Sequence, residues 1–311
     1  MARKGETFGN FLAYLAVRLA IAVMRMFSVE ANYRAVRLFG RTWWRFSAKH
    51  RRVARGHLRL SFPDWPEERI RRVARESVIN LFVLGMEVIF TPLLITPNLW
   101  KRHICPVGMT EALRLVLRRQ TGAILLTGHF GNFEVIGYTL ATLGFPTVSV
   151  VRPLDNPYVW DYMVGMLEKT GQSFLYKYGA MRSAGDVLTE RGVLSVVADQ
   201  NAGRKGMFVD FFGRPASTYK SIALLAMRYD VPILVGYGRR VGQRFQFEMS
   251  PERIIYPHEW ADKDDAPRWI TQEFTRALES SIRRWPEQYL WIHRRWRDRP
   301  DGTKAPGDGV A

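Results

Sequence analysis

The sequence predicts an α/β fold, with a mainly parallel central sheet flanked by helices and a helical, membrane-associated region ahead of it. Three observations lead to this expectation. From Gly122 onward, short apolar runs bounded by glycine alternate with segments of helical periodicity. Residues 28–100 instead carry apolar side chains at steps of three and four, as successive helices do. Residues 8–27 form an apolar stretch of about the length that crosses a bilayer.

The apolar stretch is expected to form a membrane-anchor helix, which we place within residues 1–27. Nine of its residues are Leu, Ile, Val or Phe, and each contributes about −0.3 to −0.6 kcal/mol to insertion. Arg18, near the middle, costs about 2.5 to 3.5 kcal/mol on the same scale. Because these terms nearly cancel, three placements remain open: a single span, a helix in the membrane interface, or a helix packed on the protein. Trp43 and Trp44, beside two arginines, suit contact at headgroup depth.

Residues 28–100 are expected to form a helical subregion. Helices are predicted over residues 51–60 and 67–90. The run Phe62-Pro63-Asp64-Trp65-Pro66 should separate them, because proline breaks the helical hydrogen-bond ladder.

A single domain is predicted over residues 28–300, with its α/β core at 122–250. The tail at 301–311 is rich in Gly and Pro, lacks apolar periodicity and is expected to be flexible. Within the core we expect strands at 123–127, 146–151, 173–176, 193–198 and 231–237, and helices at 135–143, 158–170, 184–189 and 221–229.

A parallel sheet of this kind usually binds its ligand beyond the carboxyl ends of its strands. The loops after Thr127, Val151 and Ala198 are therefore the first places to look for a site.

The charge balance points to an anionic partner. Lys and Arg number 46 against 29 Asp and Glu, which gives a net charge of +17. Such a field favours nucleic acid, an anionic lipid surface or an acidic carrier protein. The basic residues are spread along the chain and no nucleic-acid-binding motif is present, so we expect no nucleic-acid partner. The one cysteine, Cys105, excludes a disulfide framework and a zinc site built from thiolates.

The loop after the first core strand carries the residues most suited to catalysis. It reads Thr127-Gly128-His129-Phe130-Gly131-Asn132-Phe133-Glu134, an HX4E motif. A turn with Asn132 as helix N-cap would fold Glu134 back, so that its carboxylate holds one ring nitrogen of His129 and the other nitrogen accepts a hydroxyl proton. The alternative is a core histidine satisfied by a nearby glutamate.

The two other loops supply candidate binding residues. Arg152, directly after a strand, could hold a phosphate or a developing anion through its planar guanidinium group, although a surface arginine would look the same. After Ala198 come the polar residues Asp199 and Gln200, followed by Arg204 in a glycine-rich stretch. Their abrupt clustering at a strand end indicates a site. The ligand pattern of a calcium loop is incomplete, so no metal is expected.

Taken together, these motifs resemble the late acyltransferases of lipid A biosynthesis, in the superfamily that also holds glycerolipid and phosphatidylinositol mannoside acyltransferases. The resemblance rests on the HX4E box, the Arg152-Pro153 loop, the Asp199-Gln200 turn and the segment Phe211-Phe212-Gly213-Arg214-Pro215-Ala216-Ser217-Thr218. Two further stretches agree, at residues 52–63 and 286–296, although His57 stands where the family usually has Asn.

The resemblance implies a glycerolipid-acyltransferase-like fold and transfer of a fatty acyl chain from a thioester, on acyl carrier protein or coenzyme A, to a glycolipid hydroxyl. It makes His129 the base and Glu134 its partner, and it assigns Asn132, Arg152, Asp199, Gln200 and Arg204 to substrate. It implies no further cofactor, and it places the protein at the cytoplasmic face of the inner membrane, spanning once or bound peripherally.

One departure from the family pattern concerns the acceptor. Many lipid A enzymes carry Asp-x-Asp-x-Gly in the third loop, where this chain has Asn201 as the third residue. A phosphatidylinositol mannoside or another lipid alcohol is therefore the alternative acceptor, and a non-catalytic membrane or nucleic-acid-binding protein is the remote one. His293, near the carboxyl end, is interpreted as part of a helix that packs Trp291 and Trp296. Nothing in the sequence predicts the oligomeric state.

Overall fold

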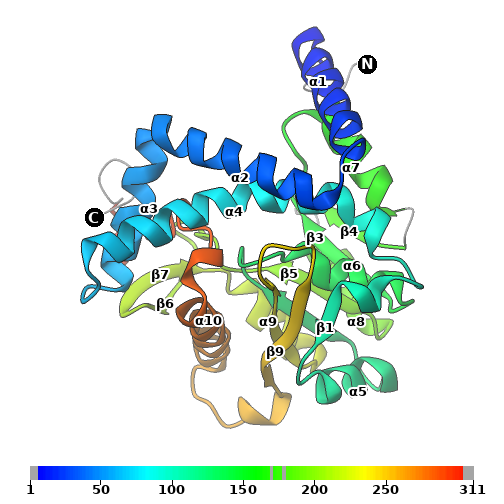
Figure 1. Ribbon diagram of the computed structural model, residues 1–311. Helices are drawn as coiled ribbons and strands as arrows, with labels where there is room; N and C mark the ends of the chain where they lie inside the picture. Colours follow the sequence, from blue (N-terminus) through cyan, green and yellow to red (C-terminus); the bar gives the residue numbers. More distant parts are fainter. Residues whose placement is uncertain (1–5, 169–170, 177–179, 304–311) are drawn as a thin grey trace.

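The computed structural model describes residues 6–168, 171–176 and 180–303 (Figure 1). Its amino-terminal part is helical, as expected. The four helices are α1 (Phe8–Arg25), α2 (Val29–Phe46), α3 (Ala48–Ser61) and α4 (Glu67–Leu94). Ser28 begins α2 by accepting a hydrogen bond from the amide of Ala31. Pro66 precedes α4, and two glutamates occupy the first turn of that helix, where they favour the positive end of its dipole.

The α/β part is built on a seven-stranded sheet with the order β1-β9-β8-β2-β5-β3-β4. Along the chain the strands are β1 (Ile104–Pro106), β2 (Ala123–Thr127), β3 (Thr147–Val151), β4 (Ser173–Tyr176), β5 (Val193–Val197), β8 (Ile233–Arg240) and β9 (Phe247–Ile255). All neighbours pair in parallel except β8 and β9, which are antiparallel. The prediction of a mainly parallel sheet is confirmed.

Helices cover both faces of the sheet. They are α5 (Thr110–Arg118), α6 (Glu134–Thr142), α7 (Pro157–Glu168), α8 (Ala180–Thr189), α9 (Ser221–Tyr229) and α10 (Ala266–Arg284). Successive side chains of β2 point to opposite faces of the sheet. Leu125 packs in a cluster with Ile136 of α6, and Leu126 packs in a second cluster with Ala226 of α9. Both side chains are buried, which explains the unbroken apolar run in the sequence.

Three short 3₁₀ helices, η1 (Trp100–Arg102), η2 (Pro257–Glu259) and η3 (Pro286–Gln288), and the antiparallel hairpin of β6 (Met207–Phe211) and β7 (Arg214–Thr218) complete the fold. The expected core boundary of 122–250 is wrong at both ends. β1 lies before it and β9 runs past it, because β9 returns antiparallel beside β8 and then pairs with β1. Neither strand follows the strand–helix alternation on which the boundary was based.

Two further predictions concern the end of α7 and the carboxyl-terminal segment. The helix predicted over 158–170 is α7, and residues 169–170 lie outside the described residues, as does most of the 301–311 tail. The expected carboxyl-terminal helix around His293 is wrong: residues after η3 form irregular turns. Trp291 and Trp296 are nevertheless buried, in a cluster with Phe62 and Phe211.

Candidate active site

Strand register brings His129 and Asp199 together. β2 and β5 are adjacent parallel strands, and Thr127 pairs with Val197 at their carboxyl ends. His129 and Asp199 each stand two residues beyond this pair, so neighbouring strands deliver them to the same place. Gly128 leaves room for this close approach, because a Cβ atom there would lie only 3.3 Å from the Asp199 side chain.

The Asp199 carboxylate binds both the ring and the backbone of His129. His129 Nδ1 donates to Asp199 Oδ1 at 2.7 Å, and the His129 amide donates to Oδ2 at 3.0 Å. Because a carboxylate only accepts hydrogen bonds, this contact fixes the proton on Nδ1 and leaves Nε2 with its lone pair. The Asp199 side chain is 2% exposed and that of His129 is 19% exposed. The ring is thus held from the protein side and open on the other.

The electrostatics of the pair make the imidazole of His129 more basic. Burial opposes the charged ring, but the charge and hydrogen bond of Asp199, together with the charge of Glu134, outweigh it and raise the pKa of His129. Burial alone would raise the pKa of Asp199; the His129 ring and amide, with His293, instead hold it below its usual range. The carboxylate therefore stays ionised beside the histidine.

The prediction that Glu134 holds a ring nitrogen of His129 is wrong: the hydrogen bond to Nδ1 belongs to Asp199. The reason is the turn at Gly131, where φ is +59°, which directs the chain into α6 with Glu134 as its first residue. Glu134 remains close enough for its charge to raise the pKa of His129. Burial raises the pKa of Glu134 itself, and the histidine partly opposes that shift.

Gln200 lies at the free nitrogen of the histidine. Its side-chain Nε2 is 3.2 Å from His129 Nε2, so the amide donates and the ring nitrogen accepts. The Phe133 ring borders the imidazole edge-on, with ring centroids 4.9 Å apart. A hydroxyl that displaced the Gln200 amide would meet the same lone pair.

The carboxyl-terminal segment clamps the loops from outside the sheet. Its backbone bonds the histidine loop at two points: Leu290 donates to the His129 carbonyl at 3.0 Å, and Gly131 donates to the Gln288 carbonyl at 3.0 Å. His293 Nε2 accepts a hydrogen bond from the backbone amide of Asn201 at 3.0 Å. Burial lowers the pKa of His293 to about 4, with Asp199 opposing the shift, so this ring is neutral.

Arg295 holds the loop that follows β5 in place from the buried side. Its guanidinium group is buried and donates to the carbonyls of Gln200 and Ser217 and to the Thr218 hydroxyl. Arg295 was not predicted from the sequence, although it lies in a run of Arg and Trp residues. An arginine spaced nearly a hundred residues from its partners gives no local signal.

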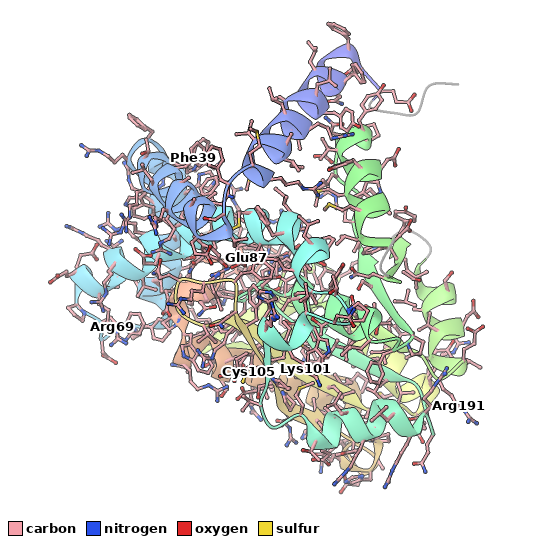
Figure 2. The ribbon with its side chains drawn as sticks, turned by 45° about the vertical axis from the view of Figure 1, so that its right-hand side comes forward. Phe39, Arg69, Glu87, Lys101, Cys105 and Arg191 are labelled. Atoms are coloured by element: carbon pink, nitrogen blue, oxygen red, sulfur yellow. The ribbon has the colours of Figure 1, made fainter. Side chains whose placement is uncertain are left out.

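Asn132 is a structural residue, which corrects its assignment to substrate. Its side chain is completely buried. Its Oδ1 accepts from the Val135 amide at 3.1 Å, the capping role that was predicted, although α6 itself begins at Glu134. Its amide donates to Glu87 Oε2 at 3.2 Å. Figure 2 labels Glu87, which lies in the interior below α2.

Glu87 of α4 anchors a buried polar network behind the histidine loop. Arg240 donates to it through Nη2 at 2.7 Å and through Nε, and Tyr33 donates through its hydroxyl at 2.5 Å. Arg240 in turn exchanges two hydrogen bonds with Gln288, between backbone and side chain. Glu87 and Arg240 form a buried ion pair with satisfied hydrogen bonds, the arrangement in which such a pair can persist.

The structure does not place the two predicted arginines at His129. Arg152 stands on an exposed turn beyond β3, where it pairs with Asp155 at 3.1 Å. Arg204 is exposed in the turn before the β6–β7 hairpin. Both remain candidates for substrate contact. Within residues 6–168, 171–176 and 180–303, no group of three His, Cys, Asp or Glu side chains could hold a metal ion.

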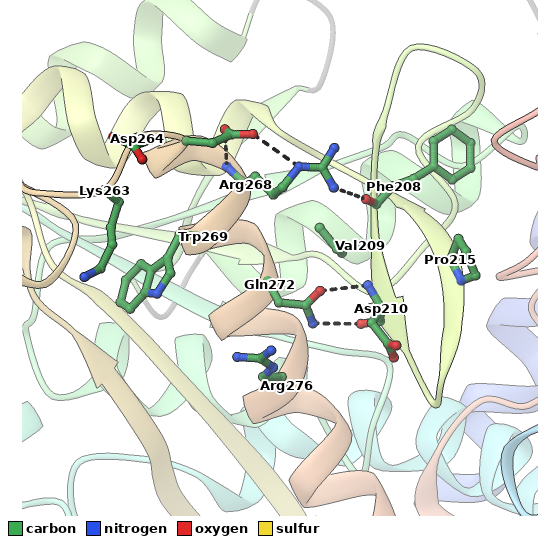
Figure 3. A pocket seen from close by; sticks show the side chains of 11 residues that line it. Phe208, Val209, Asp210, Pro215, Lys263, Asp264, Arg268, Trp269, Gln272 and Arg276 are labelled. Carbon is green, nitrogen blue, oxygen red and sulfur yellow. Dashed lines mark hydrogen bonds and ion pairs between the residues drawn. The ribbon is translucent and has the colours of Figure 1, made fainter.

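A surface cavity of about 460 Å³ lies between the β6–β7 hairpin and α10 (Figure 3). Its hydrogen bonds join the hairpin to the helix: Gln272 exchanges two with the Asp210 backbone, and Arg268 donates to the Phe208 carbonyl. Neither His129 nor Asp199 lines it. We interpret it as the junction that seats the hairpin.

Comparison with known proteins now identifies the family. A family model for bacterial lipid A biosynthesis acyltransferases matches residues 4–298. The chain belongs to this family. It is an acyltransferase, and the resemblance drawn from the motifs is confirmed.

Curated relatives agree with this assignment. The acyltransferase is 27% identical over 276 residues to the lipid A biosynthesis lauroyltransferase of Escherichia coli K12, covering 86% of this chain and 85% of that one. It is 28% identical to a lipid A biosynthesis acyltransferase of Haemophilus influenzae, over 82% and 79% of the two chains. A phosphatidylinositol mannoside acyltransferase of Mycobacterium tuberculosis is 24% identical over 61% of this chain and 59% of its own.

Proposed function

We propose that this acyltransferase moves a fatty acyl chain from a thioester to a hydroxyl of a lipid A precursor or a related glycolipid, with His129 as the general base. The observation that carries the proposal is the His129–Asp199 pair. One ring nitrogen is held by a buried carboxylate, and the other has its lone pair turned to the Gln200 amide, which an acceptor hydroxyl would displace. This is the arrangement that an oxygen nucleophile requires.

The reaction would run in two proton transfers. His129 Nε2 takes the proton of the acceptor hydroxyl as its oxygen attacks the thioester carbonyl. The tetrahedral intermediate then collapses, the carbon–sulfur bond breaks, and the imidazolium returns the proton to the leaving thiolate. Asp199, ionised throughout, stabilises the imidazolium and keeps the ring in the reactive tautomer.

The neighbouring groups have supporting roles in this proposal. Glu134 adds negative charge near the ring, which its effect on the pKa of His129 supports. The Gln200 amide, 3.2 Å from Nε2, is within reach of a carbonyl oxygen brought against that nitrogen. Arg152 and Arg204 are exposed cations that could meet anionic groups of either substrate.

The donor is proposed to be acyl carrier protein or acyl-coenzyme A, and the place of work the cytoplasmic face of the inner membrane. The net charge of +17 supports an acidic carrier and an anionic bilayer equally. The apolar helix α1 supports membrane attachment.

The alternative acceptor is a phosphatidylinositol mannoside or another lipid alcohol, and one observation bears on it. Asn201 replaces the second carboxylate of the family pattern, and its amide donates to the Arg295 carbonyl at 3.2 Å. A carboxylate could not donate this hydrogen bond. The asparagine thus has a structural explanation in this chain, so the departure by itself is no argument for the alternative acceptor.

Mass spectrometry of total lipids from the native host tests the proposal. Cells lacking the gene are compared with cells expressing the wild type or His129→Ala. The proposal expects a lipid A species lighter by one acyl chain in the deletion and in His129→Ala, with the wild type restoring it. Loss of a chain from another glycolipid would assign the alternative acceptor, and no change in any lipid would overturn the function.

A further inference from the structure

The helix α1 projects from the body of the protein with α7 beside it (Figures 1 and 2). By length and composition α1 could cross a membrane, and only 6% of it is buried. Apolar side chains such as Phe8, at 76% exposed, and Leu19, at 67%, cover its outer face. Its other face carries Tyr14, whose ring meets those of Tyr158 and Tyr162 of α7. The two helices therefore form one unit.

Arg18, the charge within α1, is exposed but contacts tyrosines of both helices. Its Nη1 donates to the Tyr14 hydroxyl at 2.7 Å, and its guanidinium carbon lies 4.5 Å from the centre of the Tyr162 ring. Tyrosine rings that present both an apolar body and a hydroxyl belong at the membrane–water interface. The contacts of Arg18 are thus those of an interfacial helix rather than of an isolated span.

The segment that leads into α7 argues against a bilayer-spanning placement of α1. The two helices run in the same direction, with Phe11 against Tyr158 near their amino ends and Arg25 against Met166 further along. Just before α7, the Asn156 amide donates to the Asn10 carbonyl at 2.8 Å. The loop from β3 therefore contacts the first turn of α1 through Asn156, and Figure 1 shows this loop rising beside the helix.

That loop is irregular and charged. Arg152 and Asp155 within it are 69% and 94% exposed. If α1 crossed the bilayer in this conformation, the loop would have to enter the hydrocarbon beside it. Irregular backbone exposed to lipid and charges of this kind do not occur there. The contacts between α1 and α7 therefore restrict α1 to one leaflet.

The helix α2 supplies a second membrane-facing surface. Its exposed apolar side chains are Leu38, Phe39, Trp43 and Phe46, the last at 82% exposure. Exposed arginines accompany them, at positions 34, 41 and 45. An apolar face bordered by basic residues is the pattern of helices that lie in the plane of an anionic membrane. Figure 2 labels Phe39 on α2.

The exposed surfaces of α1 and α2 are neighbours, and the segment that includes α2 is strongly basic. Residues 28–76 hold thirteen Lys and Arg against five Asp and Glu, so this region supplies +8 of the net +17. Asn32, buried in α2, donates to the carbonyl of Met24 in the last turn of α1 and to those of Phe27 and Ser28 in the connection that follows. This contact ties the beginning of α2 to the end of α1 and so holds the two surfaces next to each other.

We propose that α1, α2 and α7 form a monotopic surface that binds an anionic bilayer from one side, with α1 in one leaflet and its amino terminus on the same side as the active site. This proposal rests on the proposed function at the membrane and specifies how the protein is attached there. It places Arg152, on the loop beside α1, at headgroup depth, where phosphates of a glycolipid lie.

Topology is tested without any activity assay. A hydrophilic tag with a protease site is fused ahead of Met1, and Cys105, the single and exposed cysteine, reports the side of the catalytic domain. In inverted inner-membrane vesicles the proposal expects the protease to remove the tag and an impermeant maleimide to label Cys105. Tag removal only in spheroplasts, with Cys105 labelled only in inverted vesicles, would overturn it.

The lipid-binding surface is tested by flotation of the full chain with vesicles. Replacing Arg34, Arg41 and Arg45 together by Gln should weaken binding to vesicles containing phosphatidylglycerol by roughly ten- to a hundredfold. The matched control replaces three exposed arginines on and just after α5, Arg114, Arg118 and Arg119, which lie near the exposed Leu117. Unchanged binding by the triple variant would overturn the role of α2, and loss of a dimer instead would assign its face to a second copy.

These readouts separate the two proposals. If the tag and vesicle results hold while His129→Ala leaves every lipid unchanged, the attachment stands and the proposed function fails. If the lipid phenotype appears while the tag crosses the membrane, the function stands and the monotopic attachment fails.

Discussion

His129 and Asp199 are joined by two hydrogen bonds, one from the imidazole and one from the backbone, at 2.7 and 3.0 Å. One carboxylate thus sets both the tautomer of the ring and the path of the loop that carries it. Adjacent parallel strands make this possible, since each residue stands two positions past the same register pair.

Replacing this carboxylate should nearly abolish turnover. Asp199→Asn keeps the size of the side chain but removes the charge that stabilises the imidazolium, and its amide can stabilise the wrong tautomer. The expected fall in kcat is about 10²- to 10⁴-fold. Acyl transfer from a radiolabelled thioester measures it. Asp262→Asn, at an exposed carboxylate, is the matched control and should be indistinguishable from wild type. A variant within threefold of wild type at position 199 would remove Asp199 from the mechanism.

The pH dependence of kcat/KM should report His129. A general base works deprotonated, so activity is lost as pH falls through its pKa. Because that pKa is raised in the folded protein, the acid limb should lie above the ordinary histidine value of about 6.5. Rates from pH 5 to 9, with a check that the protein stays folded, give the profile. An acid limb below that value would contradict the electrostatics of the site.

The Glu134 variant separates charge from orientation. Glu134→Gln removes a negative charge that raises the pKa of His129 but leaves the Asp199 hydrogen bond intact. The acid limb should therefore move to lower pH, while kcat at high pH falls less than in Asp199→Asn. If the two variants lose kcat equally and the limb stays in place, Glu134 does more than supply charge.

The turn after the histidine tolerates no side chain. At Gly131, φ is +59°, and an added Cβ would lie 2.3 Å from the Gly238 carbonyl oxygen. Gly144 has a φ of +86° but open space around it. Gly144→Ala should cost about 1–2 kcal/mol of stability from backbone strain alone, with activity retained. Gly131→Ala should cost more and displace His129. Chemical denaturation and acyl-transfer assays measure both, and equal effects would show that the close approach is unimportant.

The buried ion pair behind the loop should be a large contributor to stability. Glu87→Gln leaves Arg240 buried without a counter-charge, which costs about 3–5 kcal/mol of unfolding free energy. Glu76, on the same helix as Glu87, pairs with Arg37 of α2 at 2.6 Å and lies nearer the surface. Glu76→Gln should cost less than about 1 kcal/mol. Urea denaturation of the two variants makes the comparison, and similar losses would contradict a special role for the buried pair.

The sequence by itself determined the strand–helix alternation, and with it the parallel sheet and the edge where a site belongs. Unbroken apolar runs such as Ala123–Thr127 are local signals of strands buried on both faces, so they could be read without tertiary contacts. His129 followed from its place just past such a strand. The amphipathic and basic character of the amino-terminal helices was likewise local.

Tertiary structure alone decided which groups meet. The partner of His129 lies seventy residues away and depends on the pairing of β2 with β5, whereas the sequence favoured Glu134 because it is near in the chain. The matching offset of His129 and Asp199 from their strand ends was the signal that could have found the pair. The clamp by Arg295 and the joining of α1 to α7 depend on contacts across 78 and 146 residues, which no local pattern encodes. Patterns in sequence fix elements, because their causes are local; sites and surfaces form where distant elements pack.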